Sequence, residues 1–355
     1  MNSSGVVSPF TLALVAFATG CGDLPPSPVV PAVVTALNAR GIAPGQANVV
    51  EVTAAHRGGE HHFIISDRTI PHGWTTFRFD NASPSDHFVL LYSVPDEARM
   101  AAEDAGQDLL EHWYQTVTVP FQETFNPYIR GEIGYGDFVD DLIGALSVSA
   151  PWYFAPGAPT MGGPGLTAAG HSSETTVNLE PGTYVIECYV KNENQEFHSY
   201  LGMLGQLTVT EAASGAREPR ATASISISQP DRGGIQIPDD LRPGMQTFAI
   251  HFGEQPQFGY EHLLGHNAHL VALDDKDDSA LLAELADWMD WMKPGGLSVR
   301  APEGARFLGG SMEMAGGKTA YYTVNLKPGD YAWIAEVPDP AGKNMLKTFT
   351  VPSGR

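Results

Sequence analysis

The most informative segment of this chain is Pro181-Gly-Thr-Tyr-Val-Ile-Glu-Cys188-Tyr-Val-Lys-Asn-Glu-Asn-Gln-Glu-Phe-His198-Ser-Tyr-Leu-Gly-Met203-Leu-Gly-Gln-Leu-Thr-Val209. Both of its ends are rich in β-branched and aromatic residues, which is typical of strands. A loop between the two predicted strands carries a thiol, an imidazole and a thioether, in that order. Sulfur and imidazole donors together favour copper over harder metals, and the thioether makes zinc the poorer match.

A copper site of two histidines and one cysteine needs a second histidine from elsewhere in the chain. His87 fits best, because it follows a polar turn and opens an apolar run in Phe77-Arg-Phe-Asp-Asn-Ala-Ser-Pro-Ser-Asp-His87-Phe-Val-Leu-Leu-Tyr92. Five other histidines compete for the position: His56, His61, His62, His72 and His171. A metal-free alternative also stays open, since cysteine and methionine are often ordinary core residues.

In their order, His87, Cys188, His198 and Met203 resemble the ligands of the cupredoxins, the type 1 or blue copper proteins. The resemblance implies one type 1 copper held by the two histidines and the cysteine, with Met203 in the axial position. It also implies electron transfer through an exposed ring edge of His198. The spacing from His198 to Met203 is similar to that of plastocyanin, whereas the longer spacing from Cys188 to His198 is similar to that of copper nitrite reductases.

An internal repeat indicates tandem copies of one fold. The segment 161–184 aligns without a gap on 308–331, so that Thr176-Val-Asn-Leu matches Thr323-Val-Asn-Leu. The same register places Ala335 opposite Cys188, and no histidine lies between Ala335 and Met345. We therefore expect no second type 1 site, although His269 and Met345 remain as possible relics of one.

Short β-rich runs separated by glycine, proline, asparagine and aspartate predict an all-β protein of antiparallel sandwich strands. A chain of 355 residues with 43% apolar content suggests about two domains. We expect two tandem Greek-key β-sandwich domains of cupredoxin-like type: 48–212 with the copper site, a linker at 213–222, and 223–355 without a type 1 site. Each sandwich is expected to carry a helical insertion, at about 96–146 in the first and about 277–292 in the second.

The N-terminus resembles a bacterial lipoprotein signal. Residues 1–20 are uncharged and contain a short apolar run, and they end at Cys21, the predicted lipidation site. The proline-rich segment 21–47 is then a tether. An ordinary secretory signal or a mis-assigned start remains open. We expect an extracytoplasmic protein, in the periplasm or at the cell surface, that is attached to the membrane by a lipid anchor alone.

Charge restricts the partners. The chain has 41 acidic and 20 basic residues, a net charge of -21, and this argues against a nucleic-acid partner because phosphates need a basic surface. Complementary charge steers brief encounters between proteins, so we expect a neutral or basic redox partner such as a cationic cytochrome. The sequence does not specify the oligomeric state.

The leading interpretation is a carrier of single electrons. A copper storage or delivery protein is the alternative. A two-domain copper oxidoreductase such as a nitrite reductase is less favoured, because Glu187 and Tyr189 flank Cys188 where such enzymes place histidine, and no His-X-His motif occurs. The sequence therefore favours a carrier over an enzyme.

Overall fold

The computed structural model describes residues 48–58, 60–154, 159–255 and 265–353. The predicted signal segment, the tether and Cys21 lie outside these residues. All of these described residues belong to one compact unit. No helix in the described ranges has the length and apolarity needed to cross a membrane.

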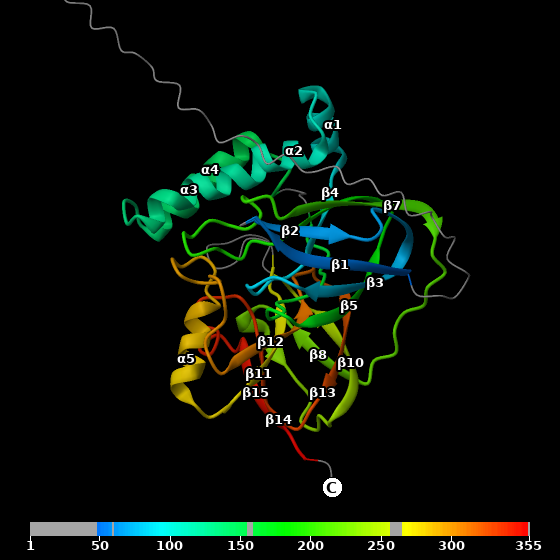
Figure 1. Cartoon of the computed structure of the whole chain (residues 1–355), viewed down its shortest axis with the longest axis vertical. Coiled ribbons are helices and arrows are strands. Elements are labelled where there is room, and N and C mark those ends of the chain that lie inside the picture. The colour runs from blue at the N-terminus through cyan, green and yellow to red at the C-terminus, as the bar shows by residue number, and fades with distance from the viewer. Residues whose placement is uncertain (1–47, 59, 155–158, 256–264, 354–355) are drawn as a thin grey trace, which may run out of the picture. The chain divides into compact units, whose positions relative to one another are not determined.

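The first half is built from two groups of strands joined by one long strand, β3 (Figure 1). In one group β1 pairs with β2 and β3, and β3 pairs with β5. In the other β4 pairs with β6, β6 with β7, and β7 with the start of β3, where the register shifts between Pro71 and His72. The bounds are β1 (Asn48–Arg57), β2 (Glu60–Ile65), β3 (Thr69–Asn81), β4 (Leu90–Val94), β5 (Ser172–Leu179), β6 (Gly182–Glu187) and β7 (Leu204–Ala213).

A helical insertion follows β4 in this half (Figure 1). The side chain of Asp108 caps α2 by accepting a hydrogen bond from the backbone N–H of Glu111. Buried aromatic and aliphatic residues of α3 and α4 face the sandwich, among them Phe125, Phe138 and Leu142. The bounds are α1 (Asp96–Ala105), α2 (Leu109–Trp113), the π-helical turn η1 (Tyr114–Thr118), α3 (Val119–Ile129) and α4 (Tyr135–Ser149).

The second half repeats this plan with a shorter insertion, the single helix α5 (Ser279–Trp288). One sheet has the order β12-β11-β14-β15, and the other runs from β13 through β10 and β8 to β9. The bounds are β8 (Ala223–Ile227), the 3-10 turn η2 (Pro230–Arg232), β9 (Ile235–Gln236), β10 (Gly244–Phe252), β11 (Ala268–Leu273), β12 (Ala305–Ser311), β13 (Thr319–Leu326), β14 (Gly329–Ile334) and β15 (Leu346–Val351).

The repeated segments pair with each other around a local pseudo-two-fold axis. In the joint between β5 and β13, Thr175 lies opposite Tyr322, its equivalent in the repeat. A second meeting point pairs Pro164 with its equivalent Ser311, and flanking bridges join Met161 to Met314 and Thr167 to Leu308. Two equivalent hydrogen bonds run in opposite directions there, from Gly165 N to Gly310 O and from Met312 N to Gly163 O. The two halves therefore share one continuous sheet.

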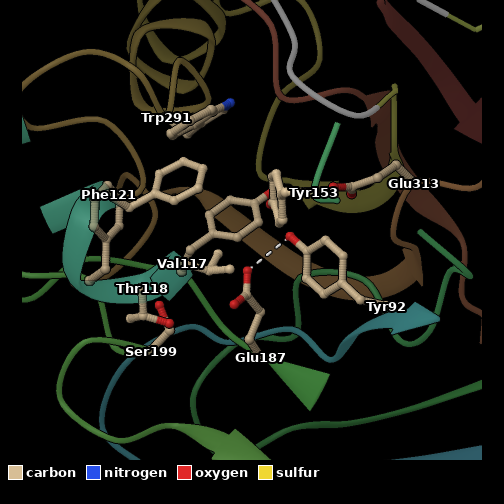
Figure 2. A pocket seen from close by; sticks show the side chains of 11 residues that line it. Tyr92, Val117, Thr118, Phe121, Tyr153, Glu187, Ser199, Trp291 and Glu313 are labelled. Carbon is tan, nitrogen blue, oxygen red and sulfur yellow. Dashed lines mark hydrogen bonds between the residues drawn. The ribbon is translucent and has the colours of Figure 1, made fainter. Parts of the chain in front are cut away.

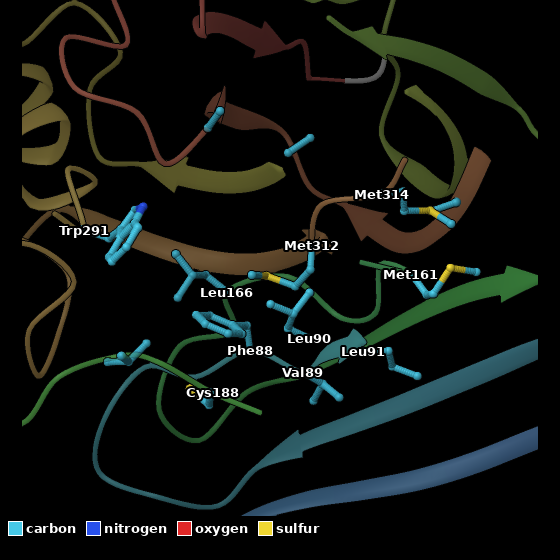
Figure 3. Close-up of a cluster of buried hydrophobic side chains, with 14 of the residues drawn as sticks. Phe88, Val89, Leu90, Leu91, Met161, Leu166, Cys188, Trp291, Met312 and Met314 are labelled. Atoms are coloured by element: carbon cyan, nitrogen blue, oxygen red, sulfur yellow. The ribbon is translucent and has the colours of Figure 1, made fainter. Parts of the chain in front are cut away.

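Apolar side chains fill the space where the halves meet. Figure 3 shows Leu90 and Leu91 of β4 in one cluster with Met312 and Met314 from the second half, and Cys188 lies at the edge of that cluster. All five side chains are buried. The metal-site cysteine is thus anchored in the apolar interior of the protein.

The mainly β architecture with a helical insertion in each half agrees with the sequence analysis. One detail differs, because three strand pairs are parallel: β1 with β3, β3 with β7, and β8 with β10. The expected boundaries at 212 and 223 stay predictions. What the structure adds is that β7 ends at Ala213, β8 begins at Ala223, and a single sheet joins the two halves.

Candidate metal centre

His87 is fixed by the polar turn that precedes it. The side-chain amide of Asn81 donates to the backbone oxygens of Ser85 and Thr167, both at 2.8 Å. The buried carboxylate of Asp86 accepts hydrogen bonds from the backbone N–H groups of Ala169 and Ala301. His87 then forms a two-way backbone bridge with Thr167. The turn therefore holds the histidine from both sides, and Ala301 belongs to the second half of the chain.

Cys188 and His198 are presented by the ends of a closed loop between β6 and β7. The backbone N–H of His198 donates to Val190 O at 2.8 Å, and the N–H of Met203 donates to His198 O at 2.8 Å. Asn192 reinforces the turn by accepting hydrogen bonds from the backbone N–H groups of Asn194 and Glu196. The long spacing between cysteine and histidine is thus a folded turn that returns His198 to the cysteine.

Three of the expected ligands meet at one point. Nδ1 of His87 lies 3.4 Å from Sγ of Cys188 and 3.2 Å from Nδ1 of His198. All three donor atoms lie within 4.8 Å of one another, and all three side chains are buried. The structure therefore contains a buried His-Cys-His cluster that resembles a type 1 copper site.

These separations fit a single bound ion. Metal bonds of about 2.0 Å to nitrogen and about 2.3 Å to sulfur, at angles of about 105–120°, place the two nitrogens about 3.2–3.5 Å apart and nitrogen and sulfur about 3.4–3.7 Å apart. The two distances found, 3.2 and 3.4 Å, lie at the short end of these ranges. Because sulfur and two imidazoles form the donor set, copper is the metal that fits it best.

Burial keeps the three ligands neutral in the absence of a cation. Burial raises the pKa of the Cys188 thiol to about 12. It also lowers the pKa of His87 and of His198 well below the usual value, and neighbouring histidines add to this effect. A cation at the cluster would compensate the thiolate charge, so that metal binding releases the thiol proton.

The expected exposure of His198 and the expected axial role of Met203 have different outcomes. The expected exposed ring edge of His198 is wrong, because the side chain is 0% exposed and its Nε2 is buried. Met203 is fully buried at the start of β7, and its role as axial ligand stays a prediction. Of the competing histidines, His61 does reach the cluster, as a neighbour of the ligands.

His61 covers the cluster from the β1–β2 hairpin. Its ring stacks on the ring of His198, with centroids 4.3 Å apart, and its Nδ1 lies 3.2 Å from Nε2 of His87. Opposite His61 in the hairpin stands His56, with ring centroids 4.6 Å apart. Burial, with His56 and His62 adding to it, lowers the pKa of His61 to about 4. Nothing in the sequence pairs His61 with the ligands, although His61, Phe63 and Ile65 alternate as the inward face of a strand.

The second half of the chain clamps the ligand loop through Lys191. Its backbone N–H donates to Leu297 O, and its backbone oxygen accepts from Val299 N. The fully buried Nζ donates to the backbone oxygens of Trp291 at 2.5 Å and Lys293 at 3.2 Å. A loop that carries two metal ligands is therefore held by contacts from outside its own sandwich.

A mainly apolar cavity of about 40 Å³ with a few polar groups in its wall is lined by Glu187, Tyr92 and Glu313 among others (Figure 2). The residues on either side of Cys188 both line it. Glu187 accepts a hydrogen bond from the hydroxyl of Tyr92 at 2.9 Å, and Tyr189 donates to Glu336 at 2.8 Å. Burial raises the pKa of Glu187 to about 7. The volume suffices for a few water molecules, and the cavity contains hydrogen-bonding groups to hold them.

The equivalent place in the second half has become a hydrogen-bonded pair. Nδ1 of His269 accepts from the backbone N–H of Leu166 at 3.0 Å, so its other nitrogen carries the proton and donates to Glu336 at 2.8 Å. Ala335 and Met345, the residues at the other ligand positions, are buried and joined by a backbone hydrogen bond. Both ring nitrogens of His269 are therefore occupied by hydrogen bonds within the protein.

Comparisons with known proteins add distant similarities. No protein-family model matches the chain, and no curated protein is significantly similar to it. Reduced auracyanin from the photosynthetic bacterium Roseiflexus castenholzii is 15% identical, over 47% of this chain and 98% of that protein, with a TM-score of 0.24. A multicopper oxidase is 10% identical, over 88% of this chain and 94% of the oxidase, with a TM-score of 0.21.

A copper nitrite reductase from Nitrosomonas europaea is 9% identical, over 86% of this chain and 94% of the reductase, with a TM-score of 0.22. TM-scores of this size carry no argument about function. The geometry of the His-Cys-His cluster must therefore support the functional interpretation.

Proposed function

We propose that this protein is a cupredoxin that carries single electrons with one type 1 copper, held by His87, Cys188 and His198 and by Met203 in the axial position. When bound, copper supplies a one-electron couple between Cu(II) and Cu(I). A near-trigonal site of two histidines and one cysteine suits both oxidation states with little movement of the ligands.

The observation that carries this proposal is the spacing of the three donor atoms. Nδ1 of His87 lies 3.4 Å from Sγ of Cys188 and 3.2 Å from Nδ1 of His198, as two ligands of one ion would, and all three donor atoms lie within 4.8 Å of one another. A rigid ligand set lowers the structural change that accompanies a change of charge on the metal. The contacts to Lys191 and Asp86 supply that rigidity from both halves of the chain.

The test is a visible and electron paramagnetic resonance spectrum of the protein from Gly22 onward, loaded with Cu(II). An intense thiolate-to-copper band with narrow copper hyperfine splitting is expected, and Cys188→Ser should abolish it. His87→Gln should also remove the type 1 spectrum, whereas His171→Gln, at an exposed position, should leave it unchanged. A protein that takes up no copper, or that binds it without the thiolate band, would refute the proposal.

Location and partner are part of the same proposal. We infer an extracytoplasmic protein anchored through a lipid on Cys21, with a cationic cytochrome or a similar redox protein as partner. The net charge of -21 supports a basic partner. Electron exchange with such a partner should slow as the salt concentration rises, because salt screens the attraction. An exchange rate that does not depend on salt would exclude electrostatic steering.

Copper storage or delivery is a second candidate, and the complete burial of all three ligands favours it. A buried site exchanges metal slowly and can retain it against competitors. Competition with a Cu(I) chelator, measured together with the rate of oxidation by an outer-sphere reagent, separates the two functions. Slow release with slow oxidation supports storage, whereas slow release with rapid, reversible oxidation supports electron transfer.

A further inference from the structure

The buried position of His198 raises the question of how electrons reach the copper site. The rings of His87 and His198 are both fully buried, so neither ligand presents an edge to a redox partner. Electron transfer over short distances needs a path of closely packed or hydrogen-bonded groups. The residues that surround the site therefore determine from which part of the surface a redox partner can exchange electrons with it.

Two sides of the ligand loop are covered by thick apolar layers. Phe197, the neighbour of His198, packs its ring 5.1 Å from Phe125 of α3 and 6.5 Å from Trp291 of the second half. The side chain of Gln122 accepts a hydrogen bond from the backbone N–H of Phe197 and fixes this contact. The helical insertion and the second half thus separate the ligands from the surface on these sides.

The β1–β2 hairpin covers the site differently, because its cover is made of imidazole rings. His61 stacks on His198 at 4.3 Å and lies within hydrogen-bonding distance of His87 at 3.2 Å, so it touches both histidine ligands. His56 is its cross-strand partner at 4.6 Å and is exposed to solvent. A continuous line of rings therefore runs from the buried ligands to the exposed ring of His56.

The contact between His87 and His61 also has a defined direction. A histidine that binds metal through Nδ1 carries its proton on Nε2 and donates it to a neighbouring acceptor. Nδ1 of His87 faces Cys188 and His198, and its Nε2 faces Nδ1 of His61. His61 is then the acceptor, and this hydrogen bond joins the ligand to the hairpin.

We propose that electrons enter and leave the copper site through His61 and His56, which makes the surface around the exposed His56 the contact surface for a redox partner. This inference rests on the proposed function and assigns its route. In each transfer one electron passes between the Cu(I)/Cu(II) couple and a one-electron redox protein, and no bond is formed or broken.

The test compares three variants of the full copper-loaded protein: His61→Leu, His56→Leu and His62→Leu. Leucine keeps the site covered while removing the ring and its nitrogen atoms. His62 is the matched control, because it neighbours His61 in β2 but its side chain points to the other face of the strand. The rate to measure is the oxidation of the Cu(I) protein by tris(phenanthroline)cobalt(III), which is reduced to cobalt(II) and is too bulky to enter the site.

Two further measurements accompany the rate. The reduction potential of each variant allows rates to be compared at equal driving force. Nitrogen-15 NMR of the Cu(I) protein identifies which nitrogen of His61 bears the proton, with Nε2 expected. This readout tests the hydrogen bond to His87 without reference to electron transfer.

The expected result is a several-fold loss of rate in His61→Leu and in His56→Leu, with the type 1 spectrum intact and with His62→Leu unchanged. An intact spectrum with unchanged rates in the first two variants would overturn the proposed route and leave the proposed function standing. A His61 protonated at Nδ1 would also overturn it. A wild-type protein without a type 1 spectrum would overturn both proposals together.

Discussion

Substitution of Lys191 by methionine should change how the stability of the protein depends on pH. Lys191 has no exposed surface, and its Nζ donates to the backbone oxygens of Trp291 and Lys293 while lying over the ring of Phe125, 5.0 Å from the centroid. Burial lowers its pKa from the usual 10.5 to about 7, and the charges of Asp290 and Glu336 oppose this effect in part. The folded protein therefore binds this proton much more weakly than the unfolded chain does.

The size of the effect follows from that difference. Between about pH 7 and 10.5 the unfolded chain holds the Lys191 proton and the folded protein does not, so the free energy of unfolding rises with pH. The slope approaches about 1.4 kcal/mol per pH unit, and a shift of 10.5 to about 7 corresponds to about 5 kcal/mol over the whole interval. Loss of the two hydrogen bonds in the methionine variant costs about 1–3 kcal/mol at every pH. The variant should be more stable than the wild type at pH 7 and less stable at pH 10.

The assay is urea unfolding of the metal-free protein at a series of pH values from 7 to 10, for the wild type and for Lys191→Met. The difference between the two proteins removes the contributions of other groups, such as the Cys188 thiol. Lys318→Met, at an exposed position, is the control and should follow the wild type. Parallel curves for the wild type and Lys191→Met would show that the buried amine does not titrate in this range.

Three further outcomes are expected. Met203→Leu should keep the thiolate-to-copper band and raise the reduction potential in voltammetry. Removal of an axial donor destabilises the more highly charged Cu(II) state more than Cu(I). An unchanged potential would remove Met203 from the ligand set. Gly163→Ala should lower the thermal midpoint strongly. A Cβ at Gly163 would lie 2.1 Å from the backbone oxygen of Val89, and the φ of Gly163, +120°, is one that alanine rarely adopts. The control Gly144→Ala, on the exposed surface of α4, should stabilise the protein by about 0.5–1 kcal/mol. Glu313→Gln should reduce the fall in the free energy of unfolding that accompanies a rise in pH from 4.5 to 8 in denaturant titrations. Burial raises the pKa of Glu313 to about 8, so the folded state holds that proton longer than the unfolded chain does; an equal fall in both proteins would contradict this.

The ligands were predictable from sequence because their chemistry is rare and their order is fixed by the chain. A thiol, an imidazole and a thioether on one loop limit the choice of metal, and the loop length matters little once the turn at Asn192 closes it. The choice of His87 over five competitors followed from the polar turn before it and the apolar run that it opens, and the structure brings it to the cysteine.

Contacts between distant segments were not predictable in this way. The burial of His198 depends on His61, which lies more than a hundred residues earlier and reaches the site only because β1 and β2 form a hairpin over it. Hydrophobic periodicity reports which face of a strand is buried, and it does not identify what that face meets. The clamp on Lys191 and the joint between β5 and β13 depend on the same kind of long-range contact.

The pseudo-two-fold joint between the halves allows the two copies of the repeat to take different roles. Equivalent residues face each other across it, as they do across the interface of a symmetric homodimer. The chain is in this sense a covalently linked pseudo-dimer. Because its two copies are separate parts of one polypeptide, they can differ in sequence. One copy carries the metal-ligand residues. The other has Ala335 where the first has Cys188, and its His269 forms a buried hydrogen bond with Glu336. The half with the candidate copper site should aggregate if it is produced alone, because without the second half the edge of β5 is open to pairing with other chains.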